Sequence, residues 1–204
     1  MPEGVIVGAD GIARCWWADS TPEYRAYHDT EWGFPVADDR RLYEKLCLEG
    51  FQAGLSWLTI LRKREAFREA FANFEVDKVA AFGEDKFAEL MGDPRIVRNR
   101  AKIEATINNA ARVIELVESE GSLAHFLWAY EAENSPATVT RATLPVTSAE
   151  SKALAKEFKR RGWRFVGPTT IYAFMEAMGL VNDHLEGCHC RAQVEAARAR
   201  FKRP

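Results

Sequence analysis

The sequence contains few cysteines, no long apolar run and no excess of charge of either sign. Four cysteines in 204 residues are too few for a disulfide scaffold, so we read them as free or metal-binding thiols. No apolar run approaches ~18 residues, which excludes a membrane-spanning helix. Residues 1–10 lack the basic start and apolar stretch of a secretory signal, so a cytoplasmic protein is expected.

Basic and acidic residues nearly balance, with 28 lysines and arginines against 30 aspartates and glutamates. Any contact with nucleic acid must then come from local basic patches, because the overall charge offers no attraction. Hydrophobic residues make up 47% of the chain, an ordinary value for a folded globular protein, which argues against disorder. The length suits a single domain or two small lobes.

Apolar residues recur at helical spacing along most of the chain. This spacing, with the capping and breaking residues, predicts helices over residues 38–53, 99–120, 122–130, 147–162, 168–179 and 192–202. Thr147 and Glu150 form the expected capping box of one helix, and Pro168 suits the first position of another. Strand propensity is confined to the short run 137–143. We therefore expect an all-α fold of about eight to ten helices, with the loop 133–147 as a boundary between lobes.

Four possible metal ligands lie near the two ends of the chain. Cys15 and His28 are near the N-terminus, and His184 and Cys188 lie at i and i+4 near the C-terminus. Two thiols and two imidazoles are typical of a tetrahedral zinc site, and a site filled by protein ligands is structural. The histidine and cysteine that follow Cys188 are competing ligands, and each residue could instead be an isolated core or surface residue.

Four of the six tryptophans fall within the first 57 residues, an uneven distribution that core packing alone does not explain. If the two N-terminal ligands meet at a metal, Trp17, Tyr27 and Trp32 are drawn together. Glu49 lies in an otherwise apolar run, and Trp57 follows eight residues later. Aromatic walls with one carboxylate suit a flat, cationic or electron-poor heterocycle. The alternatives are that Glu49 faces solvent on a helix and that the aromatic residues pack the core.

Basic residues cluster in three segments, 94–102, 156–164 and 198–203. The first begins the long predicted helix, whose N-terminal dipole favours phosphate. It contains Arg95, Arg98, Arg100 and Lys102 and no acidic residue. The alternative for any one of these segments is a solvated helix face.

Several short motifs, taken in order, resemble one known family. They are Arg-Cys-Trp-Trp at 14–17, Tyr-His-Asp-Thr-Glu-Trp-Gly at 27–33, the run 46–57, Phe-Val-Gly-Pro-Thr-Thr at 165–170, Gly-Leu-Val-Asn-Asp-His at 179–184, and Cys188. Together they resemble the DNA-3-methyladenine glycosylase I family of bacterial alkylation-repair enzymes. The resemblance covers residues 14–190, which leaves extensions at 1–13 and 191–204.

This resemblance implies an all-α, helix-hairpin-helix glycosylase fold stapled by one structural zinc ion. It assigns the zinc ligands to Cys15, His28, His184 and Cys188. It implies a monofunctional enzyme that flips 3-methyladenine out of alkylated double-stranded DNA and excises it hydrolytically, leaving an abasic site for base excision repair. A cytoplasmic monomer is expected.

The resemblance also assigns roles to individual residues. Glu49 is the carboxylate that hydrogen-bonds the damaged base, and Leu55 beside Gly54 is the wedge that fills the gap in the duplex. The pocket walls are Trp17, Tyr27, Trp32 and Trp57. A hairpin at about 90–100 grips phosphates through Arg95, Arg98 and Arg100, although it contains one glycine where the family usually has two.

Two other classes of protein compete with this interpretation. The first is a zinc-stapled helical module that binds DNA or a partner without catalysis, which would have no use for Glu49 and the aromatic pocket. The second is a plain helical protein, which would bind no zinc.

No lysine is in an evident position to act as a Schiff-base nucleophile, so the enzyme is expected to be hydrolytic only.

Overall fold

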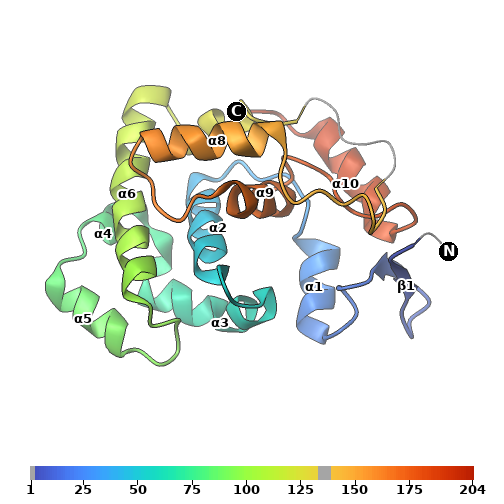
Figure 1. Ribbon diagram of the computed structural model, residues 1–204, viewed down its shortest axis with the longest axis horizontal. Helices are drawn as coiled ribbons and strands as arrows, with labels where there is room; N and C mark the ends of the chain where they lie inside the picture. The colour runs from blue at the N-terminus through green and yellow to red at the C-terminus, as the bar shows by residue number, and fades with distance from the viewer. Residues whose placement is uncertain (1–2, 133–138) are drawn as a thin grey trace.

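The computed structural model of the protein describes residues 3–132 and 139–204 (Figure 1). Its elements in chain order are β1 (Val5–Val7), β2 (Ala13–Cys15), α1 (Pro22–Thr30), α2 (Asp39–Gln52), α3 (Trp57–Ala70), the 3-10 helix η1 (Ala72–Phe74), α4 (Val76–Ala80), α5 (Glu84–Gly92), α6 (Arg100–Glu120), α7 (Leu123–Trp128), α8 (Ala149–Arg160), α9 (Pro168–Ala177) and α10 (His189–Arg200). The expectation of a mainly helical protein is confirmed. Residues 133–138 of the predicted inter-lobe loop lie outside the described residues.

The expectation of a purely α fold is wrong for the N-terminal segment, where β1 and β2 pair as an antiparallel hairpin. Val5 lies opposite Cys15 in this pairing. The turn is closed because Gly8 N–H donates to the Ile12 carbonyl and Ile12 N–H to the Asp10 carboxylate. Each strand has three residues, too short a run for alternation to be recognised in the sequence.

Side-chain caps set the ends of the helices that surround the site. Asp38, Ser56 and Asn99 cap the N-termini of α2, α3 and α6, each accepting a backbone N–H of the first turn. The predicted capping box at Thr147 and Glu150 is shifted by one residue. Ser148 and Ser151 make it instead, since each hydroxyl accepts the other residue's N–H.

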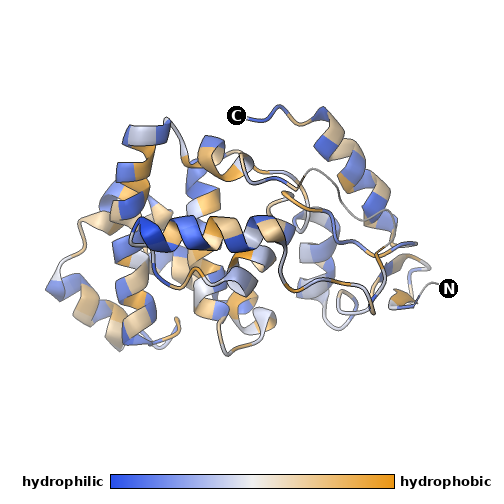
Figure 2. Ribbon diagram, turned by 45° about the horizontal axis from the view of Figure 1, so that its top comes forward, coloured by the Kyte–Doolittle hydropathy of each residue, from blue (hydrophilic) through white to orange (hydrophobic). Residues whose placement is uncertain are grey.

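Helix α2 is the centre of the molecule and contacts α3, α6, α7 and α9 (Figure 1). Residues 45–51 of α2 are all buried, so charged side chains in this run need partners inside the protein. The outer helices α8 and α10 carry hydrophilic and hydrophobic residues in alternation along the ribbon, as amphipathic helices do (Figure 2). No helix among the described residues is both long and apolar enough to cross a membrane.

The N-terminal segment and the segment around the start of α10 come together on one side of the molecule. The β1–β2 hairpin and α1 lie beside α10, and β2 contacts α10 directly (Figure 1). Residues near 15–30 and near 184–190 therefore share one region, although the whole helical core separates them in sequence.

Candidate functional site

A pocket of about 260 Å³ opens between α1, α2, α9 and the segment after β2. Its lining residues are Cys15, Trp16, Trp17, Tyr24, Tyr27, Trp32, Glu49, Gln52, Trp57, Leu144, Ala173, Glu176 and Asp183. All five residues that the sequence analysis assigned to base recognition are among them. The volume lies just below the ~300–1,000 Å³ of sites for drug-sized ligands, which suits one planar base.

The aromatic residues form two walls. Trp17 and Trp32 meet edge to face, with ring centroids 5.1 Å apart, and Tyr27 and Trp57 lie 5.4 Å apart at a 45° tilt. The Tyr24 hydroxyl accepts the Leu58 N–H, which ties α1 to the start of α3. The indole Nε1 of Trp57 is buried and has no hydrogen-bond partner among the described residues, so its N–H can serve a bound ligand.

Glu49 is buried and pairs with a residue that the sequence analysis did not identify. It is 5% exposed, so the alternative of a solvent-facing glutamate is wrong. The Lys45 ammonium, one turn earlier on α2, lies 2.7 Å from Glu49 Oε1 and donates to the Tyr27 hydroxyl oxygen at 2.8 Å. It also lies 3.4 Å from the centroid of the Trp57 ring. Burial lowers the pKa of Lys45, and the Glu49 carboxylate opposes that shift.

The spacing of Lys45 and Glu49, i and i+4 on a helix, is the sequence signal that could have identified this pair. The contact of Lys45 with Tyr27 could not have been identified in this way, because it joins different helices. Burial, followed by the Glu49 charge, raises the pKa of Tyr27 well above its usual value, which keeps the phenol protonated.

A pair of acidic residues, Glu176 and Asp183, lies at another wall of the pocket. Burial and the neighbouring Asp183 carboxyl raise the pKa of Glu176 well above its ordinary value. The Tyr172 hydroxyl donates to Asp183 Oδ2 at 2.6 Å. Glu176 was not among the residues identified from the sequence, although it is the one charged residue in the largely apolar helix α9.

The turn between α2 and α3 holds the predicted wedge beside the pocket. Gly54 has a φ of +81°, and the Leu55 N–H donates to the Gln52 carbonyl at 2.6 Å. The Leu55 side chain is 41% exposed, an unusual position for a leucine. From α6, the Lys102 ammonium donates to the carbonyls of Phe51 at 2.8 Å and Ala53 at 2.5 Å.

The predicted phosphate-gripping segment is the loop 93–99, which joins α5 to α6. Lys63 holds this loop by donating to the Pro94 and Arg95 carbonyls. Arg95 pairs with Asp93 and Glu69. These ion pairs are exposed to solvent, and exposed pairs of this kind are weak.

The other two predicted arginines lie on the same surface. Arg98 is exposed, and Arg100, also exposed, pairs with Glu104 one turn along α6. Of the three arginines, Arg98 alone forms no ion pair among the described residues.

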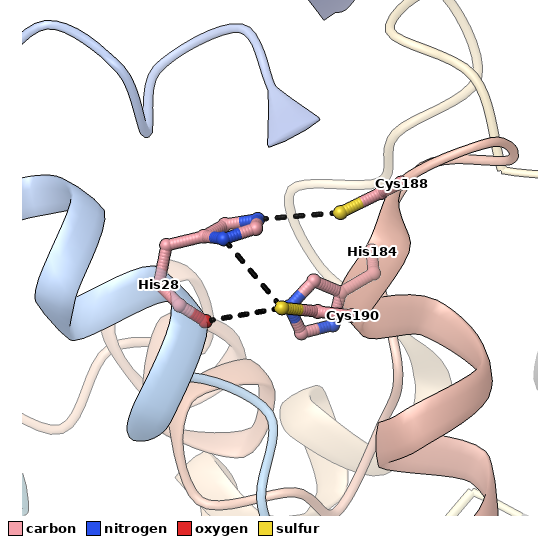
Figure 3. A group of neighbouring side chains, drawn as sticks. All are labelled: His28, His184, Cys188 and Cys190. Atoms are coloured by element: carbon pink, nitrogen blue, oxygen red, sulfur yellow. Dashed lines mark hydrogen bonds between the residues drawn. The ribbon is translucent and has the colours of Figure 1, made fainter. Parts of the chain in front are cut away.

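Two imidazoles and two thiols form a buried cluster between α1 and the segment 184–190. Figure 3 shows His28 from α1 opposite His184, Cys188 and Cys190 from the C-terminal segment, with all potential ligand atoms within 4.8 Å of one another. His28 Nε2 lies 3.4 Å from Cys188 Sγ, and His28 Nδ1 lies 3.8 Å from Cys190 Sγ. His184 Nε2 is buried without a partner among the described residues. An orphaned buried imidazole nitrogen facing two thiols fits a zinc ion.

Cys15, the fourth predicted ligand, lies beside this cluster without belonging to that group. Its sulfur accepts the Leu185 N–H at 3.4 Å, and the adjacent Cys188, together with burial, raises the pKa of the Cys15 thiol. Cys190 takes the fourth place in the cluster. His28, Asp29, His189 and Cys190 form a second, overlapping group of possible ligands.

Carboxylate and amide oxygens orient the histidine rings. Asp29 Oδ1 lies 2.8 Å from His28 Nδ1, and Asn182 Oδ1 lies 3.0 Å from His184 Nδ1. Asp29 in turn accepts hydrogen bonds from Arg14 of β2. Metal-binding histidines are typically supported in this way, and each ring is left with its Nε2 available.

The pocket walls rest on the histidine cluster. The Trp32 ring lies 4.6 Å from the His184 ring, and the Trp17 ring lies 5.1 Å from the His28 ring. Gly33, with a φ of +87°, allows this approach, because a Cβ there would lie 2.8 Å from His184 Cε1. Pocket and cluster are thus one packed unit.

Comparison with known proteins gives consistent matches over most of the chain. The sequence model of the methyladenine glycosylase family matches residues 17–192. DNA-3-methyladenine glycosylase 1 of Escherichia coli (strain K12) is 45% identical over 183 residues, which is 88% of this chain and 97% of that protein.

Solved structures agree with the sequence comparison. A crystal structure of 3-methyladenine DNA glycosylase I superposes with a TM-score of 0.84 at 43% identity, covering 87% of this chain and 99% of the other. A Staphylococcus aureus structure that addresses 3-methyladenine recognition by the same type of enzyme has a TM-score of 0.81 at 38% identity. It covers 84% of this chain and 93% of the other.

Proposed function

Because the chain belongs to the methyladenine glycosylase family, we propose how its own residues remove 3-methyladenine from alkylated DNA. The protein is a DNA glycosylase of base excision repair, a hydrolase that acts on N-glycosyl bonds. The observation that supports the following assignment is that Glu49 and four aromatic side chains line one pocket.

The substrate itself supplies much of the driving force. Adenine methylated at N3 carries positive charge in DNA, which weakens its bond to the sugar, so the leaving base needs no proton. Water attacks the sugar carbon and loses a proton to solvent, the glycosidic electron pair leaves with the base as neutral 3-methyladenine, and an abasic site remains. Lys45 does not act as a covalent nucleophile, because its ammonium is bound by Glu49 and Tyr27 and is absent from the pocket lining.

The residues of the pocket walls recognise the flipped base. Trp17, Trp57 and Tyr27 stack on its faces, where cation–π attraction to a charged base contributes about 0.5–2 kcal/mol. Glu49 accepts a hydrogen bond from an N–H edge of the base and stabilises the positive charge that develops on the sugar. Trp32, which also lines the pocket, packs edge to face against Trp17.

The turn between α2 and α3 keeps the base out of the duplex. Leu55 enters the space that the flipped nucleotide leaves, since its side chain is exposed on a turn that lies in sequence between Gln52 and Trp57, which both line the pocket. Gly54 has no side chain, and the space around its Cα is open on the protein surface. The backbone at this position can therefore approach the duplex closely. Flipping costs a few kcal/mol, and less for a damaged base.

Duplex phosphates are bound by the segment α5–loop–α6, which we propose is the helix-hairpin-helix element of the fold. Arg98 is available to a phosphate directly, and Arg95 and Arg100 can exchange their exposed carboxylate partners for phosphate. The N-terminus of α6 adds its dipole to this attraction.

The buried cluster holds one structural zinc ion in this proposal. His28, His184 and Cys188 are three ligands, and Cys15, as the family resemblance implies, or Cys190, as the cluster suggests, is the fourth. Bound zinc would crosslink the two ends of the chain and would supply no reacting group, because protein ligands fill all four positions. The residues around it keep Trp17 and Trp32 in place.

The proposal also includes the bounds of the domain, the location of the protein, its oligomeric state and its DNA substrate. Residues 14–190 form the glycosylase domain, and the protein acts as a cytoplasmic monomer on alkylated double-stranded DNA. A zinc-stapled binding module without catalysis would leave Glu49 and the aromatic pocket without a purpose, which argues against that alternative.

The test is base release from methylated duplex DNA, resolved by chromatography, for the wild type and Glu49→Gln. We expect the wild type to release 3-methyladenine and the variant to release it at least about a hundredfold more slowly with an unchanged fold. Release at the wild-type rate by the variant would remove Glu49 from the mechanism. Failure of folded, zinc-loaded wild type to release any base would overturn the proposed function.

A further inference from the structure

One buried ammonium contacts three of the residues that form the base pocket. Lys45 Nζ lies 2.7 Å from Glu49 Oε1, 2.8 Å from Tyr27 Oη and 3.4 Å from the centroid of the Trp57 ring. These residues come from α2, α1 and α3 respectively. Lys45 is thus the point where the three helices that carry the pocket are joined by polar contacts.

Lys45 lies behind the pocket wall. It does not line the main pocket but borders a smaller cavity of about 30 Å³ on the other side of Tyr27 and Trp57. Glu31 and Arg64, which pair with each other, face Lys45 across this small cavity. A group in this position acts on the base through the residues that it holds.

An ammonium can only donate hydrogen bonds, and this fixes the polarity of its two partners. Tyr27 Oη accepts from Lys45, so its own O–H must donate elsewhere, and it makes no other hydrogen bond among the described residues. Glu49 Oε1 likewise accepts from Lys45, which leaves Oε2 as an acceptor. The two partners of Lys45 therefore have opposite polarities in the pocket, with Tyr27 as a donor and Glu49 as an acceptor.

We propose that Lys45 is a positioning residue for base specificity: by fixing Tyr27 as a donor and Glu49 as an acceptor, it makes the pocket select 6-aminopurines over 6-oxopurines. This inference rests on the proposed function of the pocket. Adenine presents a 6-amino donor beside the N7 acceptor, whereas guanine presents two acceptors, O6 and N7, on the same edge. The guanine O6 would face the Glu49 carboxylate with no proton between them, and unpaired buried polar groups discriminate strongly.

The test is the ratio of release rates for 3-methyladenine and 3-methylguanine from one sample of methylated duplex DNA. We expect Lys45→Met to lower this ratio about tenfold or more, because the Tyr27 hydroxyl can then rotate and Glu49 loses its fixed orientation. Lys45→Arg, which keeps a cationic donor, should restore most of the ratio. Lys156→Met, on the exposed face of α8, is the matched control and should leave the ratio unchanged.

Tyr27→Phe tests the same idea without changing the lysine. Removal of the hydroxyl deletes the donor, so the ratio should fall to a similar extent, and adding Lys45→Met should lower it little further. An unchanged ratio in Tyr27→Phe, or equal slowing of both bases in a folded Lys45→Met, would overturn the proposal and leave Lys45 a purely structural residue. Failure of the wild type to release either base would instead overturn the proposed function.

Discussion

Lys102 is hydrogen-bonded to Ala53 across the boundary between α6 and the turn that follows α2, with 2.5 Å between the ammonium nitrogen and the carbonyl oxygen. The same ammonium binds the Phe51 carbonyl, so it satisfies two acceptors at the C-terminal end of α2. No acidic side chain pairs with Lys102 within the described residues, and burial lowers its pKa. Its position suggests that its main effect is to fix the turn that carries Leu55.

Lys102→Met should slow excision from duplex DNA by about tenfold, because the wedge turn would lose two of its anchoring hydrogen bonds. The free energy of unfolding should change by less than about 2 kcal/mol, since removal of a buried ammonium relieves a desolvation cost that offsets the lost bonds. Single-turnover base release and urea denaturation measure the two effects. Lys63→Met is the control, because it loosens the loop 93–99 and should weaken DNA binding without slowing the bound complex.

Leu55→Ala should separate base flipping from chemistry. The side chain is 41% exposed, so its truncation should alter the free energy of unfolding by less than about 0.5 kcal/mol. Excision from duplex DNA should fall severalfold or more, whereas excision from single-stranded DNA should stay close to the wild-type rate. Equal loss on both substrates would show that Leu55 is not a wedge.

The fourth zinc ligand is decided by comparing Cys15→Ser with Cys190→Ser. Zinc content, measured by elemental analysis, should fall well below one ion per chain in the variant that removes a true ligand, and the melting temperature should fall with it. A chelator should lower the wild-type melting temperature in the same direction. Glu49→Gln is the control and should keep both zinc and melting temperature, since its side chain lies in the pocket. Wild type that is purified folded without metal would refute the structural-zinc proposal.

The raised pKa of Glu176 predicts how the free energy of unfolding depends on pH. Burial and Asp183 raise its pKa well above the ordinary value of 4.5, and the nearby Glu49 adds to the rise while Lys45 opposes it. The folded protein therefore binds more protons than the unfolded chain above pH 4.5, so the stability contributed by Glu176 is lost as the pH rises through the folded pKa.

Glu176→Gln removes this titration. Its free energy of unfolding should match the wild type near pH 4.5 and exceed it progressively as the pH rises to 8. Urea denaturation across that range measures the difference. Glu118→Gln, on the exposed face of α6, is the matched control. A wild type whose advantage over Glu176→Gln increases with pH would contradict the assigned direction.

The sequence predicted the helices well where long amphipathic patterns and caps coincide. The predicted helix over 99–120 is α6, with Asn99 as its N-cap and Gly121 at its end. The hairpin at β1 and β2 was missed because three-residue strands have no detectable periodicity. The capping box was predicted one residue too early, at Thr147 instead of Ser148, because both residues have a hydroxyl group that can cap a helix.

The candidate site also combines residues that the sequence predicts with contacts that it does not predict. Glu49 was identified from the sequence because a carboxylate in an apolar run requires a partner. Lys45 could have been identified as that partner, because the two residues lie at i and i+4 on a helix. The contacts of Lys45 with Tyr27, and of Lys102 with Ala53, depend on how separate helices pack. No local pattern encodes that packing, so these residues were found only in the three-dimensional structure.

The sequence distance between His28 and Cys188 has a consequence for synthesis of the protein. These two residues are 160 positions apart, yet their side chains lie together beneath Trp17 and Trp32. Closing a loop of that length costs roughly 4–5 kcal/mol in chain entropy, which bound zinc would offset. A nascent chain on the ribosome can therefore complete the base pocket only after the segment from α9 to Cys188 has emerged, because Ala173, Glu176 and Asp183 line that pocket. Chains that terminate before this segment lack that wall.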